Sequence, residues 1–415
     1  MSSTVSESFT SSDDYASFLR GELAVPFDLY ATMRREEPVH WAPEAESWVL
    51  TKYRDVQAIS QFDVRVSSDR LRRLLSPVGG EAGFESLHDH LRTWVTFLDP
   101  PDHTRMRDTA KRNLAPAEVS RMEGRISVIV DNLLTQMETR HEPDLIRDLA
   151  FPLPAMVVCE VLGVPTDDLV RLQDWSNRAM RFMENVSPNV ALVAADANAA
   201  IMEMTVFLEP LVQARRESPR EDLISALVPL VDSGKLSSAA LYGWCLLLLI
   251  AGHETTTGLI GNAVTTLLQY PEAMTALRED PSKVERAIEE VLRFESPVDR
   301  QTRLALEDLV VGGRTIAAGD RMYLMLAAAN RDPEAFPDPD RFDINRSPNR
   351  HLGFGYGIHF CLGAALARLE ARTAILAILD RYPHLALAGT PTRWRGQTMR
   401  RFESAPIALG MPNRT

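Results

Sequence analysis

Residues 354 to 363 read Phe354-Gly355-Tyr356-Gly357-Ile358-His359-Phe360-Cys361-Leu362-Gly363. Three glycines in this stretch surround a single cysteine, and a run of strong helix formers follows directly from Ala364 to Arg372. The pattern predicts a glycine-rich loop that leads into a helix, with Cys361 close to the helix N-terminus. Unpaired N–H groups at a helix start favour a thiolate, and the glycines let the backbone approach a flat, bulky group.

Two interpretations of this cysteine loop, residues 354–363, are open on the residues alone. A thiolate under a permissive loop suits an axial ligand to haem iron, whereas a plain turn would leave Cys361 as a small buried apolar residue. The unbroken pattern F-G-x-G-x-H-x-C-x-G resembles the haem-binding loop of cytochrome P450 monooxygenases. The resemblance favours the first interpretation and implies that Phe354, Gly355, His359 and Gly363 surround a haem b whose iron Cys361 binds.

The composition places limits on the partners and the compartment. The 415 residues include 45% hydrophobic and 25% charged residues, the balance of a soluble globular protein. A formal net charge of −12 argues against nucleic acid as a partner. The three cysteines, Cys159, Cys245 and Cys361, lie far apart in the sequence, which argues against a disulfide framework and fits a reducing cytosol.

No segment has the features of a signal peptide or a membrane anchor. The first 18 residues lack a basic stretch followed by an apolar core, and the uncharged stretch Leu236–Gly252 is short for a membrane span. This stretch runs directly into His253-Glu254, so we interpret it as part of a buried helix. A cytoplasmic protein of bacterial type, without membrane attachment, is expected.

Helix periodicity dominates the chain, with short strand patterns in two places, so the predicted fold is mainly α with small β-sheets. Residues 1–20 are predicted to be a flexible tail and residues 21–415 a single domain, because no linker or repeat interrupts them. Strands are expected at 38–41, 47–51, 304–309, 314–316 and 321–326. The longest helix is expected from about Ser237 to Leu268, apolar nearly all round and therefore central. Residues 70–90 hold no long period and predict a long loop with one helical turn.

The middle of the predicted central helix reads Ala251-Gly252-His253-Glu254-Thr255-Thr256. Glycine and threonine are poor residues for a buried helix interior, and a buried carboxylate is costly without partners. A kinked core helix with internally satisfied side chains is the structural alternative. Beside the cysteine loop, the segment resembles the acid–alcohol pair of the P450 distal helix, which lies over the haem. The resemblance implies that Ala251 and Gly252 border the haem and that Gly252 makes room for dioxygen. It also implies that Thr255 stabilises the hydroperoxo intermediate and that Glu254 feeds protons toward the distal oxygen.

A third motif, Glu290-Val291-Leu292-Arg293, places a carboxylate and a guanidinium on one helix face. Such a pair alone is most often a surface ion pair. Its position between the central helix and the cysteine loop resembles the P450 pair that an arginine of the following irregular stretch joins. That resemblance makes Arg341, in Pro339-Asp340-Arg341-Phe342, the candidate third member of a structural ion network.

Cations are expected around the haem propionates, because a guanidinium matches a carboxylate with two parallel hydrogen bonds. Four residues match the family pattern, although each alone could be a surface or core residue. They are His103, Arg107, Arg303 and His359.

Basic residues gather around these motifs in an otherwise acidic chain. They are Arg105, Arg107, Lys111, Arg112, Arg346, Arg350, Arg368 and Arg372. Such a patch would attract an acidic partner to the cysteine side, and an ordinary solvated face is the alternative. By resemblance to bacterial P450s, the partner is a ferredoxin or flavodoxin with its NAD(P)H reductase, and the protein is expected to be a monomer.

The resemblance is least specific where substrate would bind. The candidate pocket residues mix apolar and charged side chains, which suits a medium-to-large, partly polar molecule such as a macrolide, polyketide or modified peptide. The candidates are Leu74, Phe84, Phe182, Met183, Leu247, Val298, Arg300, Arg400 and Phe402.

The sequence thus predicts a haem-thiolate monooxygenase that hydroxylates or epoxidises its substrate with dioxygen. A haem-binding sensor or carrier on the same fold is the alternative, and Glu254 and Thr255 argue against it because a carrier needs no proton relay. A helical binding protein without haem is a third possibility.

Overall fold

The computed structural model describes residues 15–18, 26–61, 64–75, 84–183, 189–394, 396 and 398–410, apart from the side chains of residues 72, 73 and 86. Most of the predicted flexible tail therefore lies outside the described residues. Residues 15–18 of that segment do not behave as a tail, because they are helical and bury Tyr15 and Phe18 against Tyr30.

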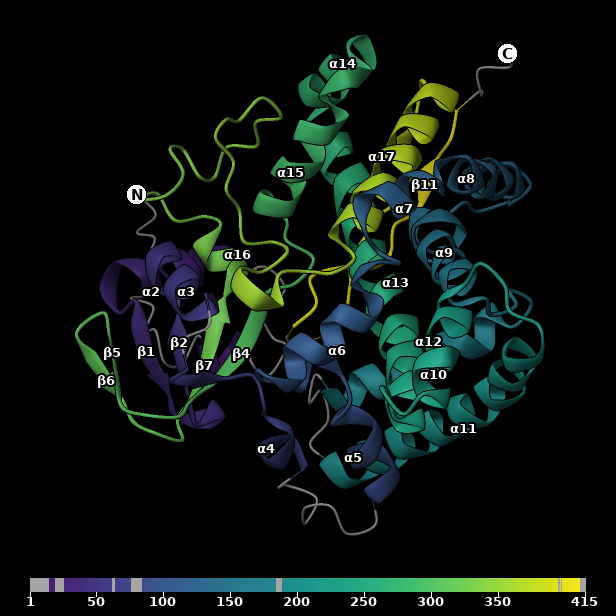
Figure 1. Ribbon diagram of the computed structural model, residues 1–415. Helices are drawn as coiled ribbons and strands as arrows, with labels where there is room; N and C mark the ends of the chain where they lie inside the picture. The colour runs from purple at the N-terminus through teal and green to yellow at the C-terminus, as the bar shows by residue number, and fades with distance from the viewer. Residues whose placement is uncertain are drawn as a thin grey trace.

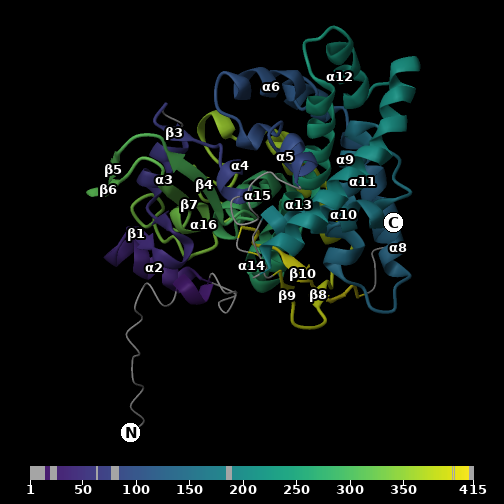
Figure 2. The same cartoon turned by 90° about the horizontal axis from the view of Figure 1, so that it is seen from below.

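A five-stranded sheet forms one side of the molecule, and helices form the rest (Figures 1 and 2). Its strands are ordered β1-β2-β7-β4-β3, with β2 and β7 parallel and the other neighbours antiparallel. The strands are β1 (Val39–Ala42), β2 (Ser47–Leu50), β3 (Val66–Ser67), β4 (Arg300–Ala305) and β7 (Arg321–Met325). The strands predicted at 38–41, 47–51 and 321–326 are confirmed, whereas the strand expected at 304–309 is divided between β4 and β5 (Leu309–Val311). The strand at 314–316 is confirmed as β6 (Arg314–Ile316), which pairs with β5.

The central helix is α13 (Ser238–Gln269), within one residue of its predicted bounds. The Ser237 hydroxyl accepts a hydrogen bond from the Ala240 amide at its start. Apolar residues are buried on all its sides, because two of the large core clusters meet along it. In Figure 1 it passes through the middle of the helical part.

The other helices surround α13 and the sheet. Those before α13 are α2 (Phe27–Glu36), α3 (Tyr53–Ser60), α4 (Leu71–Leu75), α5 (Glu85–Leu91), α6 (Asp102–Lys111), α7 (Pro116–Ser120), α8 (Glu123–Glu138), α9 (Pro152–Leu162), α10 (Leu169–Met183), α11 (Val190–Glu217) and α12 (Leu223–Asp232). Those after it are α14 (Pro271–Glu279), α15 (Val284–Phe294), α16 (Leu326–Ala329) and α17 (Ala364–Arg381). Single turns are η1 (Pro43–Ala45), η3 (Val95–Phe97), η4 (Ile146–Ala150), η5 (Pro281–Lys283) and η6 (Gly357–His359).

The long loop predicted at residues 70–90 is wrong in its described parts. Two short helices, α4 and α5, occupy them, and residues 76–83 lie outside the description. The side chain of Asn198 on α11 accepts a hydrogen bond from the Leu87 amide, and Leu87 and Leu91 are buried in the core. Tertiary contacts with α11 and α13 therefore stabilise α5, which is too short for its sequence to show a helical hydrophobic period.

Short strands near the C-terminus complete the fold, and the segment between them pairs with the residues just before β4. The strands pair as β8 (Ala386–Leu387) with β11 (Ile407–Ala408) and β9 (Thr392–Arg393) with β10 (Phe402–Ser404). One described helix, α11, is long and apolar enough by those two criteria to cross a membrane, with a mean hydropathy of 1.5. It packs along α10, α12 and α5, and 28% of its apolar window is buried.

Candidate functional site

The cysteine loop is built as the sequence predicts. Gly355 and Gly357 adopt positive φ angles of 73° and 72°, where other residues are strained. The Cys361 amide donates a hydrogen bond to the Phe354 carbonyl at 2.9 Å, which closes the loop before α17 begins at Ala364. This turn presents the Cys361 side chain to a cavity.

The protonation of Cys361 differs from the simple expectation. Burial raises the pKa of the Cys361 thiol, and the Gly363 amide, Arg107 and Arg368 only partly offset this effect. The helix start is three residues away, so its N–H groups cannot outweigh the loss of hydration. A bound metal cation is the agent that would deprotonate this thiol.

The cavity has a volume of about 310 Å³ and lies between α13 and the cysteine loop. Ala251, Gly252 and Thr255 lie on its α13 wall, opposite Cys361. Its other lining residues include Phe354, Gly355, His359, Gly363, Arg107, Leu247 and Val298. The structure therefore brings the predicted distal and proximal motifs to one space.

Gly252 is required by packing as well as by the cavity. A Cβ atom at this position would lie 2.8 Å from Cγ2 of Val158 on α9. Beside it, the Thr255 hydroxyl donates to the Ala251 carbonyl at 3.2 Å, one turn back along the helix. Glu254 does not line this cavity, because it projects from another side of α13 toward Arg401.

Cations converge at the edge of the cavity. Arg303 and His103 are buried, and the ring centroids of His103 and His359 lie 4.3 Å apart. Burial and the neighbouring Arg303 lower the pKa of His359 to about 2. Burial followed by Arg107 also lowers the pKa of His103.

Arg70 belongs to this cluster and was missed from the sequence, where it only began an irregular segment. Burial and then the nearby Arg70 charge lower the pKa of Arg303 to about 10. Asp99, whose charge reaches the cluster, already accepts hydrogen bonds from Ser67 and the Ser68 amide. Arg70 joins the cluster only because it lies close in space to the Asp99 segment. The sequence does not show that proximity.

These residues fit a haem with its propionates at this edge. Both ring nitrogens of His103 and Nε of Arg303 are buried without a hydrogen-bond partner among the described residues. Gln301, which lines the cavity, has a buried side-chain oxygen in the same condition. Arg107 donates to the Phe360 carbonyl beside Cys361 at 2.5 Å. Carboxylates would satisfy the donors, and one thiolate would suffice for iron held in a macrocycle.

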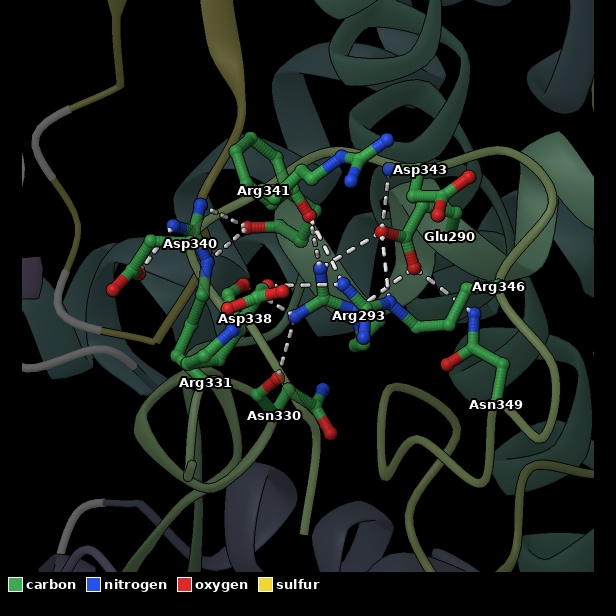
Figure 3. Close-up of polar contacts among 12 residues, drawn as sticks. Glu290, Arg293, Asn330, Arg331, Asp338, Asp340, Arg341, Asp343, Arg346 and Asn349 are labelled. Atoms are coloured by element: carbon green, nitrogen blue, oxygen red, sulfur yellow. Dashed lines mark hydrogen bonds and ion pairs between the residues drawn. The ribbon is translucent and has the colours of Figure 1, made fainter. Parts of the chain in front are cut away.

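The ion network on the proximal side differs from the prediction in one member (Figure 3). Glu290 and Arg293 are fully buried and form two hydrogen bonds of 2.8 Å. The third member is Arg346, whose guanidinium Nε lies 3.2 Å from Oε1 of Glu290. Arg341 contributes only its carbonyl oxygen, which accepts from Arg293 at 3.1 Å, and its residue is exposed.

Of the nine candidate pocket residues, Leu247 and Val298 line the cavity. Arg300 is instead stacked on Tyr323, 4.0 Å from the ring centroid, and Arg400 pairs with Glu295 at 3.1 Å. The remaining candidates pack into the hydrophobic core: Leu74, Phe84, Phe182, Met183 and Phe402. The two charged candidates are wrong because buried aromatic and acidic partners hold them away from the cavity.

The predicted basic patch is partly neutralised. Four of its members pair with carboxylates, in the pairs Arg105–Asp102, Arg346–Glu290, Arg368–Glu289 and Arg372–Glu123. Lys111, Arg112 and Arg350 are exposed, and no ion pair is found for them in the described part of the chain. The exposed cationic surface is therefore smaller than the sequence suggested.

Comparisons with known proteins agree with this architecture. A family model described as Cytochrome P450 matches residues 72–394. Polyketide biosynthesis cytochrome P450 PksS of Bacillus subtilis is 36% identical over 92% of this chain and 96% of its own. Vitamin D(3) 25-hydroxylase of Pseudonocardia autotrophica is 41% identical over 88% of each chain. The structure of P450BioI with a hexadec-9Z-enoic acid ligated acyl carrier protein matches with a TM-score of 0.87 and 35% identity, covering 95% of this chain and 100% of that one.

Proposed function

The chain belongs to the cytochrome P450 family and is a monooxygenase of that family. On this premise we propose which residues bind its haem, which residues supply protons and which class of substrate it oxidises. Cys361 is the proposed iron ligand of a haem b. Ala251 and Gly252 would border the haem on the α13 side, and Arg70, His103, Arg303 and His359 would hold its propionates. The observation that carries this proposal is that Cys361, Thr255, Arg107 and His359 line one cavity. Arg303, His103 and Arg70 lie close enough to His359 for their charges to lower its pKa.

The bound haem supplies the redox chemistry that activates dioxygen. The protein's own residues do the rest. Thr255 places its hydroxyl in the cavity at the level of Ala251, and Glu254 is the proposed acid that keeps it supplied with protons. Gly363 and the cysteine loop shield the ligand from solvent. The Glu290 and Arg293 network is proposed to fix the irregular stretch that leads into this loop.

The proposed substrate is a medium-to-large lipophilic molecule of secondary metabolism, such as a polyketide or macrolide, with hydroxylation or epoxidation as the reaction. The cavity wall near α13 and β4 supports a lipophilic group, because Val95, Trp244, Leu247 and Val298 line it. The relatives' names also support it, since they refer to a polyketide, a vitamin D and a fatty acid on a carrier protein.

Electrons are proposed to come from NAD(P)H through a separate ferredoxin or flavodoxin and its reductase. Lys111, Arg112 and Arg350, exposed near the cysteine side, support the docking of an acidic partner there. We further propose that residues 21–415 form a single haem domain that works as a cytoplasmic monomer.

The alternative is a haem-binding sensor or carrier, and a turnover experiment distinguishes it from an oxygenase. The holoprotein is supplied with a surrogate ferredoxin, reductase, NADPH and ¹⁸O₂, and candidate lipophilic substrates are first selected by their shift of the resting spectrum. One ¹⁸O atom in the product supports the oxygenase. Tight substrate binding with electron transfer but no labelled product would favour the carrier and contradict the proposal.

A further inference from the structure

A second cavity of about 580 Å³ lies on another side of α13 from the haem site. Glu254 and Thr257 line it from α13, and the buried hydroxyl of Thr257 has no hydrogen-bond partner among the described residues. The other walls come from η4, α10 and the segment around β10, and include Asp144, Arg147, Gln173, Asn177, Trp394, Arg401 and Glu403. A cavity of this size has room for several water molecules, and these polar side chains offer them hydrogen-bond partners.

Glu254 is held between two basic groups at this cavity. The Arg401 Nε atom lies 2.9 Å from Oε2, and the Arg401 guanidinium stacks 4.4 Å from the Trp394 ring centroid. The His253 Nε2 atom lies 3.3 Å from Oε1 of Glu254, an ion-pair distance. Glu254 and His253 are each 3% exposed, so little water screens this contact.

The hydrogen bond on the far side of the His253 ring determines which nitrogen carries a proton. Nδ1 lies 2.6 Å from the carbonyl oxygen of Leu249, which can only accept, so Nδ1 must donate. In a neutral ring, Nε2 would then present a lone pair to the Glu254 carboxylate. The contact is attractive only when a further proton lies on His253 or on Glu254.

We propose that His253 is a positioning residue that shares one proton with Glu254, and that water in the second cavity replaces this proton after each turnover. The inference rests on the proposed function, because it takes Glu254 to supply protons to Thr255. It assigns to His253, Arg401 and the second cavity a role in proton supply from the side of α13 that does not face the iron.

The charges around Glu254 keep its carboxylate ionised, which is the form that attracts a proton on Nε2 of His253. Burial acts to raise the pKa of Glu254, but His253 and Arg401 outweigh it, and the net pKa lies below the usual range. Arg401 faces the pair from the C-terminal segment, whereas Asp144, Arg147 and Glu403 line the cavity. Phe151 packs its ring edge-on against His253, with centroids 5.5 Å apart.

The protonation state is measured directly by NMR of the ¹⁵N-histidine-labelled holoprotein in its reduced, carbon monoxide-bound, diamagnetic form. His253→Phe identifies the signals of His253. We expect Nδ1 to be protonated at all pH values. In Glu254→Gln, Nε2 should lose its proton at a pH at least about one unit lower than in the wild type, because the adjacent carboxylate that favours the charged ring is gone. A bare Nδ1, or a titration unchanged in Glu254→Gln, would overturn the proposal.

Turnover provides the second readout, with His141→Phe as the control, because His141 is almost fully exposed at 97% of its side chain. His253→Phe is expected to slow turnover about ten-fold or more and to increase the solvent deuterium isotope effect, since proton transfer becomes limiting. A variant with intact thiolate-ligated haem and an unchanged isotope effect would contradict the role of His253 and leave the proposed function intact. Loss of the thiolate-haem spectrum in the unmodified protein would instead contradict the proposed function.

Discussion

Arg70 shows how a single residue can belong to a site that its sequence context conceals. Its guanidinium is 4.5 Å from the Phe97 ring centroid, and burial lowers its pKa to about 10. The pKa of Arg303 is also lowered by burial, and the charge of Arg70 contributes to that shift. Two guanidinium groups that have lost part of their hydration repel each other, so an anionic group that binds between them gains from both.

We predict that Arg70→Gln weakens haem retention. The loss of one hydrogen bond to a charged group, about 1.5–3 kcal/mol, should raise the rate of haem transfer to an apoglobin about ten-fold or more. Arg54→Gln, which changes an exposed arginine outside the cluster, is the matched control. Equal transfer rates for Arg70→Gln and the control would show that Arg70 holds no propionate.

The proximal ion network gives a second prediction at this scale. Arg346→Ala should lower the free energy of unfolding by about 1–3 kcal/mol, because it removes a partner from a fully buried carboxylate. Arg341→Ala should stay within about 0.5 kcal/mol, since only its carbonyl takes part. Chemical denaturation of both holoproteins measures the difference. The reverse order would restore the assignment made from the sequence.

The sequence was sufficient to predict residues whose roles depend on a local motif. It was insufficient for residues whose roles depend on contacts between distant parts of the chain. Cys361 and Gly355 stand in one continuous motif, so their positions were predictable. Arg341 and Arg346 lie five residues apart in an irregular stretch, and either could reach Glu290. The choice depends on the turn between them, where the Asp343 amide donates to Glu290 at 2.9 Å.

At the scale of elements, α13 separates two cavities, one lined by Thr255 and the other by Glu254. Its bounds and central position followed from its length and its all-round apolar character. The orientation of Glu254 did not follow, because it depends on Arg401, a residue almost 150 positions later. The helix α5 was missed for a related reason: its stability comes from contacts with α11 and α13, not from its own sequence.

The packing of α13 against α9 gives a prediction of its own. Gly252→Ala should destabilise the protein by about 1–3 kcal/mol, because the added methyl group collides with Val158. Gly124→Ala is the matched control: it lies in α8 with nothing within 4 Å, and should be neutral or stabilising by up to about 1 kcal/mol. Adding Val158→Ala should restore part of the stability of Gly252→Ala, and thermal unfolding measures all three. No recovery in the double variant would mean that the collision is not the cause.

At the scale of the whole molecule, ion pairs between distant elements make the fold sensitive to acid. Glu289 on α15 pairs with Arg368 on α17 at 2.6 Å and with His351 at 3.0 Å. Burial opposes ionisation of Glu289, but these hydrogen bonds outweigh it and lower its pKa from 4.5 to about 2. The folded pKa is below the unfolded one, so the contribution is complete above about pH 4.5 and declines toward pH 2.

Glu289→Gln should therefore make the melting temperature less dependent on pH between about pH 5 and pH 3, where the ionised glutamate normally loses its advantage. Glu285→Gln, an exposed change on the same helix, should keep the wild-type slope. Melting curves of the holoproteins across this range provide the test. Parallel slopes for wild type and Glu289→Gln would show that the α15–α17 ion pair adds nothing to acid stability.

The central claim concerns the whole site: Cys361 binds haem iron as a thiolate in the cavity opposite Thr255. The most direct measurement is the absorbance spectrum of the dithionite-reduced protein under carbon monoxide, for wild type and Cys361→Ala, each expressed with added haem precursor. The account predicts a strongly red-shifted Soret band in the wild type and its loss in Cys361→Ala. A Soret band at the position of imidazole-ligated haem, or a red-shifted band that survives Cys361→Ala, would contradict it.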